Sequence, residues 1–338
     1  MILARLAGPR RFELLEQPTP EPGPGEVLLE VAFVAVCGSE FAPYLGTATQ
    51  FPLYECVARY PRTVGHEASA VVAALGPGVN SVHVGDNVVP RSALFASHAI
   101  AQAEDLVPIP SGVSLEHAAL TLMGQETYYL CHEMLRIQPE DSVLIIGVGP
   151  FGMLCVEHAR DIGCTSITVA DMHTSRLEIA QQLGASRAIN AAVDDVSKTA
   201  EEERPTVVIE CSGQPQPIQQ AIRLAAPLAR VALAGRPYKP LDGFTIEDVF
   251  HNMLTVLGGK IPPPGYAPMY RQRVLDMLKA GRIHAAQHIT HTFPLSEVGE
   301  AFEVAIDPLR GGLKVVVHCQ RATIPGRSTA QHAEQSRH

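Results

Sequence analysis

The chain has 338 residues, of which 46% are hydrophobic and 18% are charged, so it can bury a large core and is not disordered in composition. This length allows two domains of ordinary size. The formal charge of −9 argues against a nucleic-acid or anionic-membrane partner, because both need a basic surface. No apolar run reaches the roughly 18 residues of a membrane span and no signal-peptide core follows the N-terminus, so we expect a soluble, cytoplasmic protein.

The number and spacing of the cysteines indicate which kinds of covalent or metal cross-link the chain can contain. The seven cysteines are an odd number and include no Cys-x-x-Cys pair. Disulfide frameworks and four-cysteine structural zinc sites need closely spaced pairs, so we expect neither in this chain.

The first third of the chain has the pattern of β structure. Short β-branched runs over residues 25–38 and 68–89 are cut by Gly, Pro and Asn turns. This pattern predicts a β-rich domain over residues 1–119.

Strands alternate with helices beyond that point. Residues 116–135 are helical in composition, and short apolar runs alternate with helical stretches after them. The runs are residues 142–149, 166–171, 186–190, 206–211, 229–235 and 253–259. This alternation predicts a doubly wound parallel sheet, an α/β fold, over residues 120–283. Residues 284–319 return to mixed strand and helix and are expected to rejoin the first domain, and residues 320–338 to form a flexible tail.

The strongest local signal is a Gly-x-Gly-x-x-Gly motif that follows the first apolar run and opens a helix. Its residues are Gly147, Gly149, Pro150, Phe151 and Gly152. In this context the first glycine permits a tight turn and the second lets the backbone approach a pyrophosphate. The third lets the helix pack on the strand, with the N-terminus of the helix facing the phosphates. The alternative is an ordinary Gly-rich turn.

Residues near the next strand ends indicate which dinucleotide binds. Asp171 ends the second strand, where a carboxylate accepts hydrogen bonds from the adenosine ribose and repels a 2′-phosphate, so NAD is favoured over NADP. Arg176 could accommodate a phosphate, but beside Asp171 we interpret it as a neighbour of the ribose. Cys211 ends the fourth strand and is expected to pack beside NAD rather than act as a nucleophile.

Two short segments of the β-rich domain carry residues that bind metals. Cys37 lies in a Cys-Gly-Ser-Glu segment, and His66 and Glu67 lie in a Gly-His-Glu segment. Thiolate and imidazole suit zinc, and a catalytic zinc takes three protein ligands and one open position. By themselves they could equally be a buried core cysteine and a histidine with an ordinary partner.

The order of these motifs along the chain is similar to that of a known protein family. A β-rich domain with both metal-type segments, followed by the glycine motif and the pattern of residues 169–185, resembles the zinc-dependent medium-chain dehydrogenase/reductase (alcohol dehydrogenase) superfamily. The polyol and threonine dehydrogenase branch is the most similar. The resemblance covers about residues 1–318 and implies a GroES-like β-barrel catalytic domain beside the Rossmann domain. It also implies a small-molecule alcohol or ketone as substrate, and a homodimer or homotetramer.

The resemblance implies one catalytic Zn²⁺ held by Cys37, His66 and Glu67. Many members have a third ligand, often Cys, where our alignment places Met123, which is a poor zinc ligand. Either Glu67 binds the metal directly, or the site is degenerate and holds none. Glu126 is a nearby carboxylate that could reach the site or lie on the helix surface.

Further departures concern proton transfer and the substrate pocket. Ser39 occupies the hydroxyl position that passes on the alcohol proton, although it could also be only a turn residue. The relay histidine expected three residues later is replaced by Ala42. Aromatic and polar residues after Cys37 are candidates for the pocket wall, with ordinary core or loop as the alternative: Phe41, Tyr44, Phe51, Glu55 and Cys56.

The expected function is therefore oxidation of a secondary alcohol of a polyol, sugar or cyclitol, or reduction of the ketone, with zinc and NAD. A zinc-free quinone or enone reductase of the same superfamily is the first alternative, and a non-catalytic nucleotide-binding protein is the second.

Overall fold

The computed structural model describes residues 1–47, 59–237, 241, 246–259, 261–263 and 265–320. The pocket candidates Phe51, Glu55 and Cys56, and the predicted tail beyond Gln320, lie outside these residues. Within the described ranges, no helix is both long and apolar enough to cross a membrane.

Six parallel strands form the sheet of one half of the molecule. They are β9 (Ser142–Ile146), β10 (Ser166–Asp171), β11 (Arg187–Asn190), β12 (Val207–Glu210), β13 (Arg230–Leu233) and β14 (Thr255–Gly258). Their order is β11-β10-β9-β12-β13-β14, so the chain direction across the sheet reverses between β9 and β12. Each predicted apolar run supplies one of these strands, and the predicted doubly wound sheet is confirmed.

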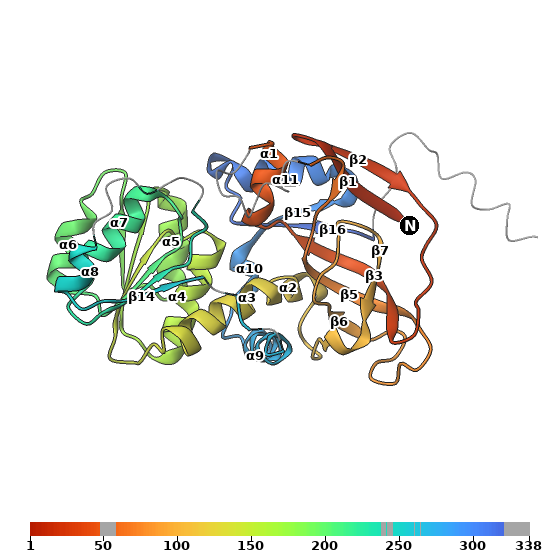
Figure 1. The fold of residues 1–338 in the computed structure, drawn as a ribbon, viewed down its shortest axis with the longest axis horizontal. Helices are drawn as coiled ribbons and strands as arrows, with labels where there is room; N and C mark the ends of the chain where they lie inside the picture. Colours follow the sequence, from red (N-terminus) through yellow and green to blue (C-terminus); the bar gives the residue numbers. More distant parts are fainter. Residues whose placement is uncertain (48–58, 238–240, 242–245, 260, 264, 321–338) are drawn as a thin grey trace, which may run out of the picture.

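Helices cover both faces of this sheet (Figure 1). They are α4 (Pro150–Ile162), α5 (Thr174–Leu183), α6 (Val196–Glu203), α7 (Pro215–Arg223) and α8 (Glu247–His251), whereas α9 (Ala267–Lys279) packs against the helical stretch that joins the two halves of the molecule. Alternate residues of β9 point to opposite cores, since Val143 and Ile145 pack with α4 and α5, whereas Leu144 and Ile146 pack with α7. Burial on both faces explains why the strand is a continuous apolar run rather than an alternating one.

The other half is β-rich and contains both early and late segments. Its larger sheet has the order β15-β16-β3-β5-β6-β8, with β7 also paired to β3. These strands are β3 (Glu26–Ala35), β5 (Glu67–Leu75), β6 (Asn87–Val89), β7 (His98–Gln102), β8 (Val107–Pro108), β15 (Ile289–Pro294) and β16 (Lys314–His318). A smaller sheet contains β1 (Ile2–Gly8), β2 (Arg11–Glu16) and β4 (Arg62–Thr63). Strand β16 pairs antiparallel with β3, which brings the C-terminal segment back to the first one.

Short helices complete this half: α1 (Phe41–Leu45), α10 (Ala285–His288) and α11 (Val298–Ile306). The domain boundaries near residues 119 and 284 stay predictions.

The helical stretch that joins the two halves is not one regular helix. It comprises α2 (Leu115–Ala118), α3 (Thr121–Tyr128) and a π-helical segment, Tyr129–Met134. At the first break Ala119 and Leu120 donate to carbonyls three residues back, and at the end Leu135 donates to Leu130, five residues back. Figure 1 shows α3 between the β-rich half and the parallel sheet.

Candidate metal centre and dinucleotide site

The predicted metal ligands lie together. Cys37 follows β3, His66 precedes β5, and Glu67 is the first residue of β5. Because β3 and β5 pair with Ala35 opposite Glu67, the end of one strand meets the start of the other. One ligand atom from each of the three side chains lies within 4.8 Å of the others, the only such cluster of potential metal ligands among the described residues.

Glu40 connects the two segments that carry these ligands. Its Oε1 accepts a hydrogen bond from the Gly65 amide at 2.6 Å and lies 3.3 Å from His66 Nδ1. Its Oε2 accepts from the Cys37 amide at 3.3 Å. A buried carboxylate on the second nitrogen of a ligand histidine fixes the orientation of the ring, as is usual around protein-bound metals. This role was not foreseen from the sequence, although the position of Glu40 within the Cys-Gly-Ser-Glu segment was a signal.

The electrostatics of the cluster favour a positive charge. Burial lowers the pKa of His66, but hydrogen bonds to Cys37 and Glu40 outweigh this effect and raise the pKa to about 11. Groups that stabilise a proton on His66 would equally stabilise a metal cation in its place, with release of that proton. The donor set of thiol, imidazole and carboxylate is one that zinc accepts, so these residues fit the metal.

Lys314 is an unforeseen member of the cluster. It lies in β16 with only 2% of its side chain exposed, and its Nζ forms an ion pair with Glu67 Oε2. The ammonium also donates to the Val36 carbonyl at 3.0 Å and lies 3.9 Å from Met123 Sδ. Burial lowers the pKa of Lys314, but the charges of Glu67 and Cys37 outweigh it and raise the pKa. Met123 therefore lies beside the cluster, where the resemblance placed it. The Lys314 ammonium is paired with one carboxylate oxygen of Glu67, a predicted metal ligand.

The other predicted residues of this region have mixed positions. Ser39 lies beside the thiol, since its Oγ donates to Cys37 Sγ at 3.2 Å. Tyr44 is a core residue rather than part of a pocket wall: it is 1% exposed and its ring packs against those of Phe12 and Phe302. Its hydroxyl donates to Glu303 Oε1 at 2.8 Å, which satisfies the buried polar group. Phe41 packs against the same core, and Glu126 lies on α3.

The glycine motif has the geometry that its three glycines were predicted to need. Gly147 has φ of +91°, which a residue with a side chain rarely adopts. A Cβ on Gly152 would lie 2.1 Å from the Gly147 carbonyl oxygen, so only glycine allows α4 to start this close to β9. A Cβ on Gly149 would meet nothing within 4 Å, so this side of the turn is open for a pyrophosphate. The turn therefore fits a dinucleotide.

Two further predicted residues belong to the start of α4. Pro150 is its first residue, where the fixed φ of proline suits a helix start. Phe151 is half-buried and packs against the core clusters on both sides of α4.

Acidic side chains close the turns at the ends of β10 and β12. Asp171 Oδ2 accepts from the Val148 amide of the glycine motif at 2.9 Å. Glu210 Oε1 accepts from the Ser212 amide at 2.7 Å, and burial raises the pKa of Glu210 in spite of such bonds. Cys211, next to Glu210, packs at the edge of the core under the glycine motif, and Arg176 lies in the first turn of α5.

Comparisons with known proteins agree with this arrangement. The model of the alcohol dehydrogenase GroES-like domain matches residues 23–111, and that of the zinc-binding dehydrogenase family matches residues 150–279. The starvation-sensing protein RspB of Escherichia coli is 27% identical, over 88% of this chain and 93% of RspB. Sorbitol dehydrogenase of Halalkalibacterium halodurans is 27% identical, over 89% of this chain and 97% of the enzyme. L-threonine 3-dehydrogenase of Pyrococcus horikoshii is 28% identical, over 86% of this chain and 91% of the enzyme.

Solved structures share the fold. An E. coli alcohol dehydrogenase (rspB) in complex with NADH superposes with a TM-score of 0.83 at 24% identity, over 94% of this chain and 99% of that one. Galactitol-1-phosphate dehydrogenase from E. coli also has a TM-score of 0.83, at 21% identity, over 94% and 100% of the two chains. The chain belongs to the zinc-dependent medium-chain dehydrogenase/reductase (alcohol dehydrogenase) superfamily and is an oxidoreductase that acts on CH–OH groups.

Proposed function

We propose that this protein is a zinc-dependent, NAD-linked dehydrogenase that oxidises a secondary alcohol of a polyol, sugar or cyclitol, or reduces the corresponding ketone. The convergence of Cys37, His66 and Glu67 carries this proposal, because their ligand atoms lie within 4.8 Å of one another and three protein ligands are what a catalytic zinc takes. Zinc at this position would act as a Lewis acid that polarises the substrate oxygen.

The chain's own residues have distinct tasks in this proposal. Glu40 orients the His66 ring and ties it to the Cys37 segment. Lys314 holds Glu67 through one carboxylate oxygen and leaves the other available for the metal. Ser39 has its hydroxyl beside the thiol and would accept the proton of the substrate hydroxyl. Since Ala42 cannot relay this proton, it would leave through the nicotinamide ribose and water.

The substrate class rests on relatives. Two of them are sorbitol dehydrogenases, from Halalkalibacterium halodurans and Ovis aries, each 27% identical to this chain. A carboxylate donates less charge to zinc than a thiolate does, so replacing a thiolate by Glu67 leaves a harder and more Lewis-acidic metal, which suits substrates that chelate it through a second hydroxyl.

Lys314 also supports a second candidate, a zinc-free quinone or enone reductase. A buried ammonium that is ion-paired with Glu67 and 3.9 Å from Met123 Sδ lowers the affinity of the cluster for a second cation. The two candidates differ in substrate: turnover of polyols or cyclitols with NAD, lost in Cys37→Ser, supports the zinc enzyme. Turnover of enones or quinones that Cys37→Ser leaves unchanged supports the reductase.

We also propose that the protein is a homodimer that pairs through β14. This strand is last in the order of the parallel sheet, and the apolar side chains around it are exposed: Phe250 by 76%, Met253 by 63% and Val256 by 37%. Among the described residues the outer edge of β14 is unpaired, and a strand edge with apolar neighbours is a typical site of association. Light scattering should give twice the chain mass for the wild type and the chain mass for Val256→Lys, and a monomeric wild type contradicts this proposal.

A further inference from the structure

Arg271 places a positive charge in the interior of the protein without a carboxylate as its partner. It lies on α9 and is only 1% exposed. Its Nη1 donates one long hydrogen bond, of 3.4 Å, to the Val89 carbonyl, and its buried Nε has no acceptor. No ion pair joins its guanidinium to a carboxylate within the described part of the chain. A guanidinium has five N–H donors, so the described side chains and backbone use little of its capacity.

This environment is unfavourable for a cation. Arginine is almost never fully buried without a partner, because a charge loses its hydration when it leaves water. Burial lowers the pKa of Arg271 to about 10. The charge of Asp105, which forms no ion pair with Arg271, raises the pKa only in part, and the charge of Arg91 lowers it further. A bound anion would neutralise the guanidinium and accept its N–H groups.

The packing of α9 on α3 determines what surrounds Arg271 (Figure 1). Tyr270 packs against Tyr128, and a Cβ on Gly124 would lie 2.6 Å from Val274 Cγ1. These two contacts show that the helices are antiparallel, so Arg271 lies level with the residues between Gly124 and Tyr128. Its hydrogen bond to β6 places the guanidinium on the side of α9 that faces the β-rich half.

Two buried polar side chains belong to this part of α3. Thr121 and Gln125 are four residues apart and so lie on one face of the helix. Thr121 is fully buried and Gln125 is 6% exposed. Neither Thr121 Oγ1 nor Gln125 Oε1 has a hydrogen-bond partner among the residues that the structure describes. A hydroxyl and an amide can each donate to an anion, but neither can neutralise a guanidinium. The junction of α9, α3 and β6 therefore combines an unpaired cation with polar groups that an anion would satisfy.

We propose that the junction of α9, α3 and β6 binds one small monovalent anion, such as chloride, with Arg271 as its counter-ion. One charge has to be neutralised and the position is buried, so a small monovalent ion fits better than phosphate, whose further charges would themselves be left without partners. The anion would connect α9, which follows the parallel sheet in the chain, with a strand of the β-rich half, and would stabilise the contact between them. The inference does not depend on zinc, on the dinucleotide or on the identity of the alcohol.

The test is thermal unfolding of the wild type at constant ionic strength, with sodium gluconate replaced stepwise by sodium chloride. Gluconate is too large for a buried position and serves as the reference anion. The melting temperature should rise by about 3 °C as chloride reaches about 100 mM, and then level off, because the ion binds only the folded state. A melting temperature that does not respond to chloride overturns the inference.

Variants of α9 show whether the response comes from Arg271. Arg271→Met removes the charge and keeps a long side chain, so its melting temperature should not respond to chloride. In gluconate this variant should be at least as stable as the wild type, because it no longer buries an unpaired charge. Arg273→Met changes an exposed arginine of the same helix and should keep the wild-type response. A response that survives in Arg271→Met means that the anion binds elsewhere, which overturns the inference.

Crystals of the wild type soaked in sodium bromide give a second measurement that needs no variant. Bromide should replace chloride and produce an anomalous-scattering peak in contact with the Arg271 guanidinium. Water at this position with no anomalous signal overturns the inference. A bromide peak without a chloride response in solution means binding at crystal concentration only and overturns it as well.

Discussion

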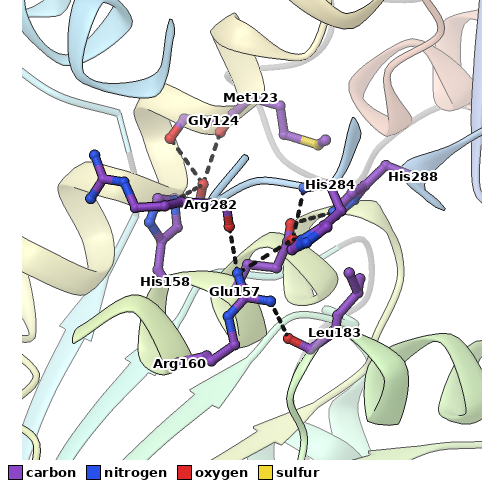
Figure 2. A network of polar contacts seen from close by, with 10 residues as sticks. Met123, Gly124, Glu157, His158, Arg160, Leu183, Arg282, His284 and His288 are labelled. Atoms are coloured by element: carbon purple, nitrogen blue, oxygen red, sulfur yellow. Dashed lines mark hydrogen bonds and ion pairs between the residues drawn. The ribbon is translucent and has the colours of Figure 1, made fainter. Parts of the chain in front are cut away.

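Glu157 Oε2 and His288 Nε2 lie 2.6 Å apart, and neither side chain has any exposed surface. The other oxygen of Glu157 accepts from the amide and the Nδ1 of His284, at 2.9 and 2.8 Å (Figure 2). Glu157 belongs to α4, the helix that the glycine motif opens, whereas His288 ends α10 and leads directly into β15 of the other sheet. One buried carboxylate thus fixes the nucleotide-binding helix to the segment that returns to the metal-containing half.

Removing the charge of Glu157 should destabilise the protein by about 3 kcal/mol, because a buried histidine then loses its ionic partner. Denaturant unfolding of Glu157→Gln against the wild type measures this difference. The exposed Glu178→Gln on α5 is the matched control and should change stability by less than about 0.5 kcal/mol. Equal stability of the two variants would show that the carboxylate contributes nothing.

The contribution of Glu157 should depend on pH. Burial raises the pKa of Glu157, but its hydrogen bonds with His288 and His284 outweigh burial and lower the pKa. A carboxyl whose pKa is lower in the folded state stabilises the protein fully above the unfolded pKa of about 4.3, and loses this effect as pH falls through the folded pKa. The stability gap between wild type and Glu157→Gln should therefore be constant from pH 7 to 6 and shrink below about pH 4. A stability difference between the two proteins that grows as the pH falls would contradict this prediction.

Glu40 should contribute to metal affinity without being a ligand. In Glu40→Gln the His66 ring loses a charged partner, and zinc affinity should fall about 10- to 100-fold, as for other carboxylates that support ligand histidines. Competition with a chromophoric chelator measures the affinity. The exposed Glu104→Gln is the control and should bind zinc like the wild type. A wild-type affinity in Glu40→Gln means that the carboxylate does not orient the ring.

Lys314 should matter most to the metal-free protein. Lys314→Met leaves the buried Glu67 charge without its partner, which should destabilise the chelator-treated protein by about 3 kcal/mol. Added zinc would neutralise Glu67 in its place, so the rise in melting temperature on zinc addition should be larger in Lys314→Met than in the wild type. Lys279→Met, an exposed change at the end of α9, should show the wild-type rise. A smaller rise in Lys314→Met would mean that zinc does not bind next to Glu67.

Local sequence pattern was sufficient to predict the parallel sheet and its glycine turn. Each strand is a short apolar run bounded by turns, and the special conformation of Gly147 follows from the neighbouring strand and helix. The pairing of Cys37 with His66 was predicted from the order of motifs in a resembling family rather than from the spacing alone.

Contacts between segments that are distant in the sequence could not be predicted from local pattern. Lys314 stands in an apolar run, which indicates only that a buried charge needs a partner, and not that the partner is Glu67. Tyr44 follows the metal segment closely, yet its ring completes a core with Phe302 from α11. The helix predicted over residues 116–135 is interrupted at Ala119, where Ala119 and Leu120 donate to carbonyls three residues back instead of four. Amino-acid composition does not reveal such a local change.

The most direct test of the metal centre is the zinc content of protein purified without added metal or chelator. We expect about one zinc per chain in the wild type and in the control Cys164→Ser, and none in Cys37→Ser. A wild type that binds NADH but holds no zinc would contradict a metal-dependent enzyme.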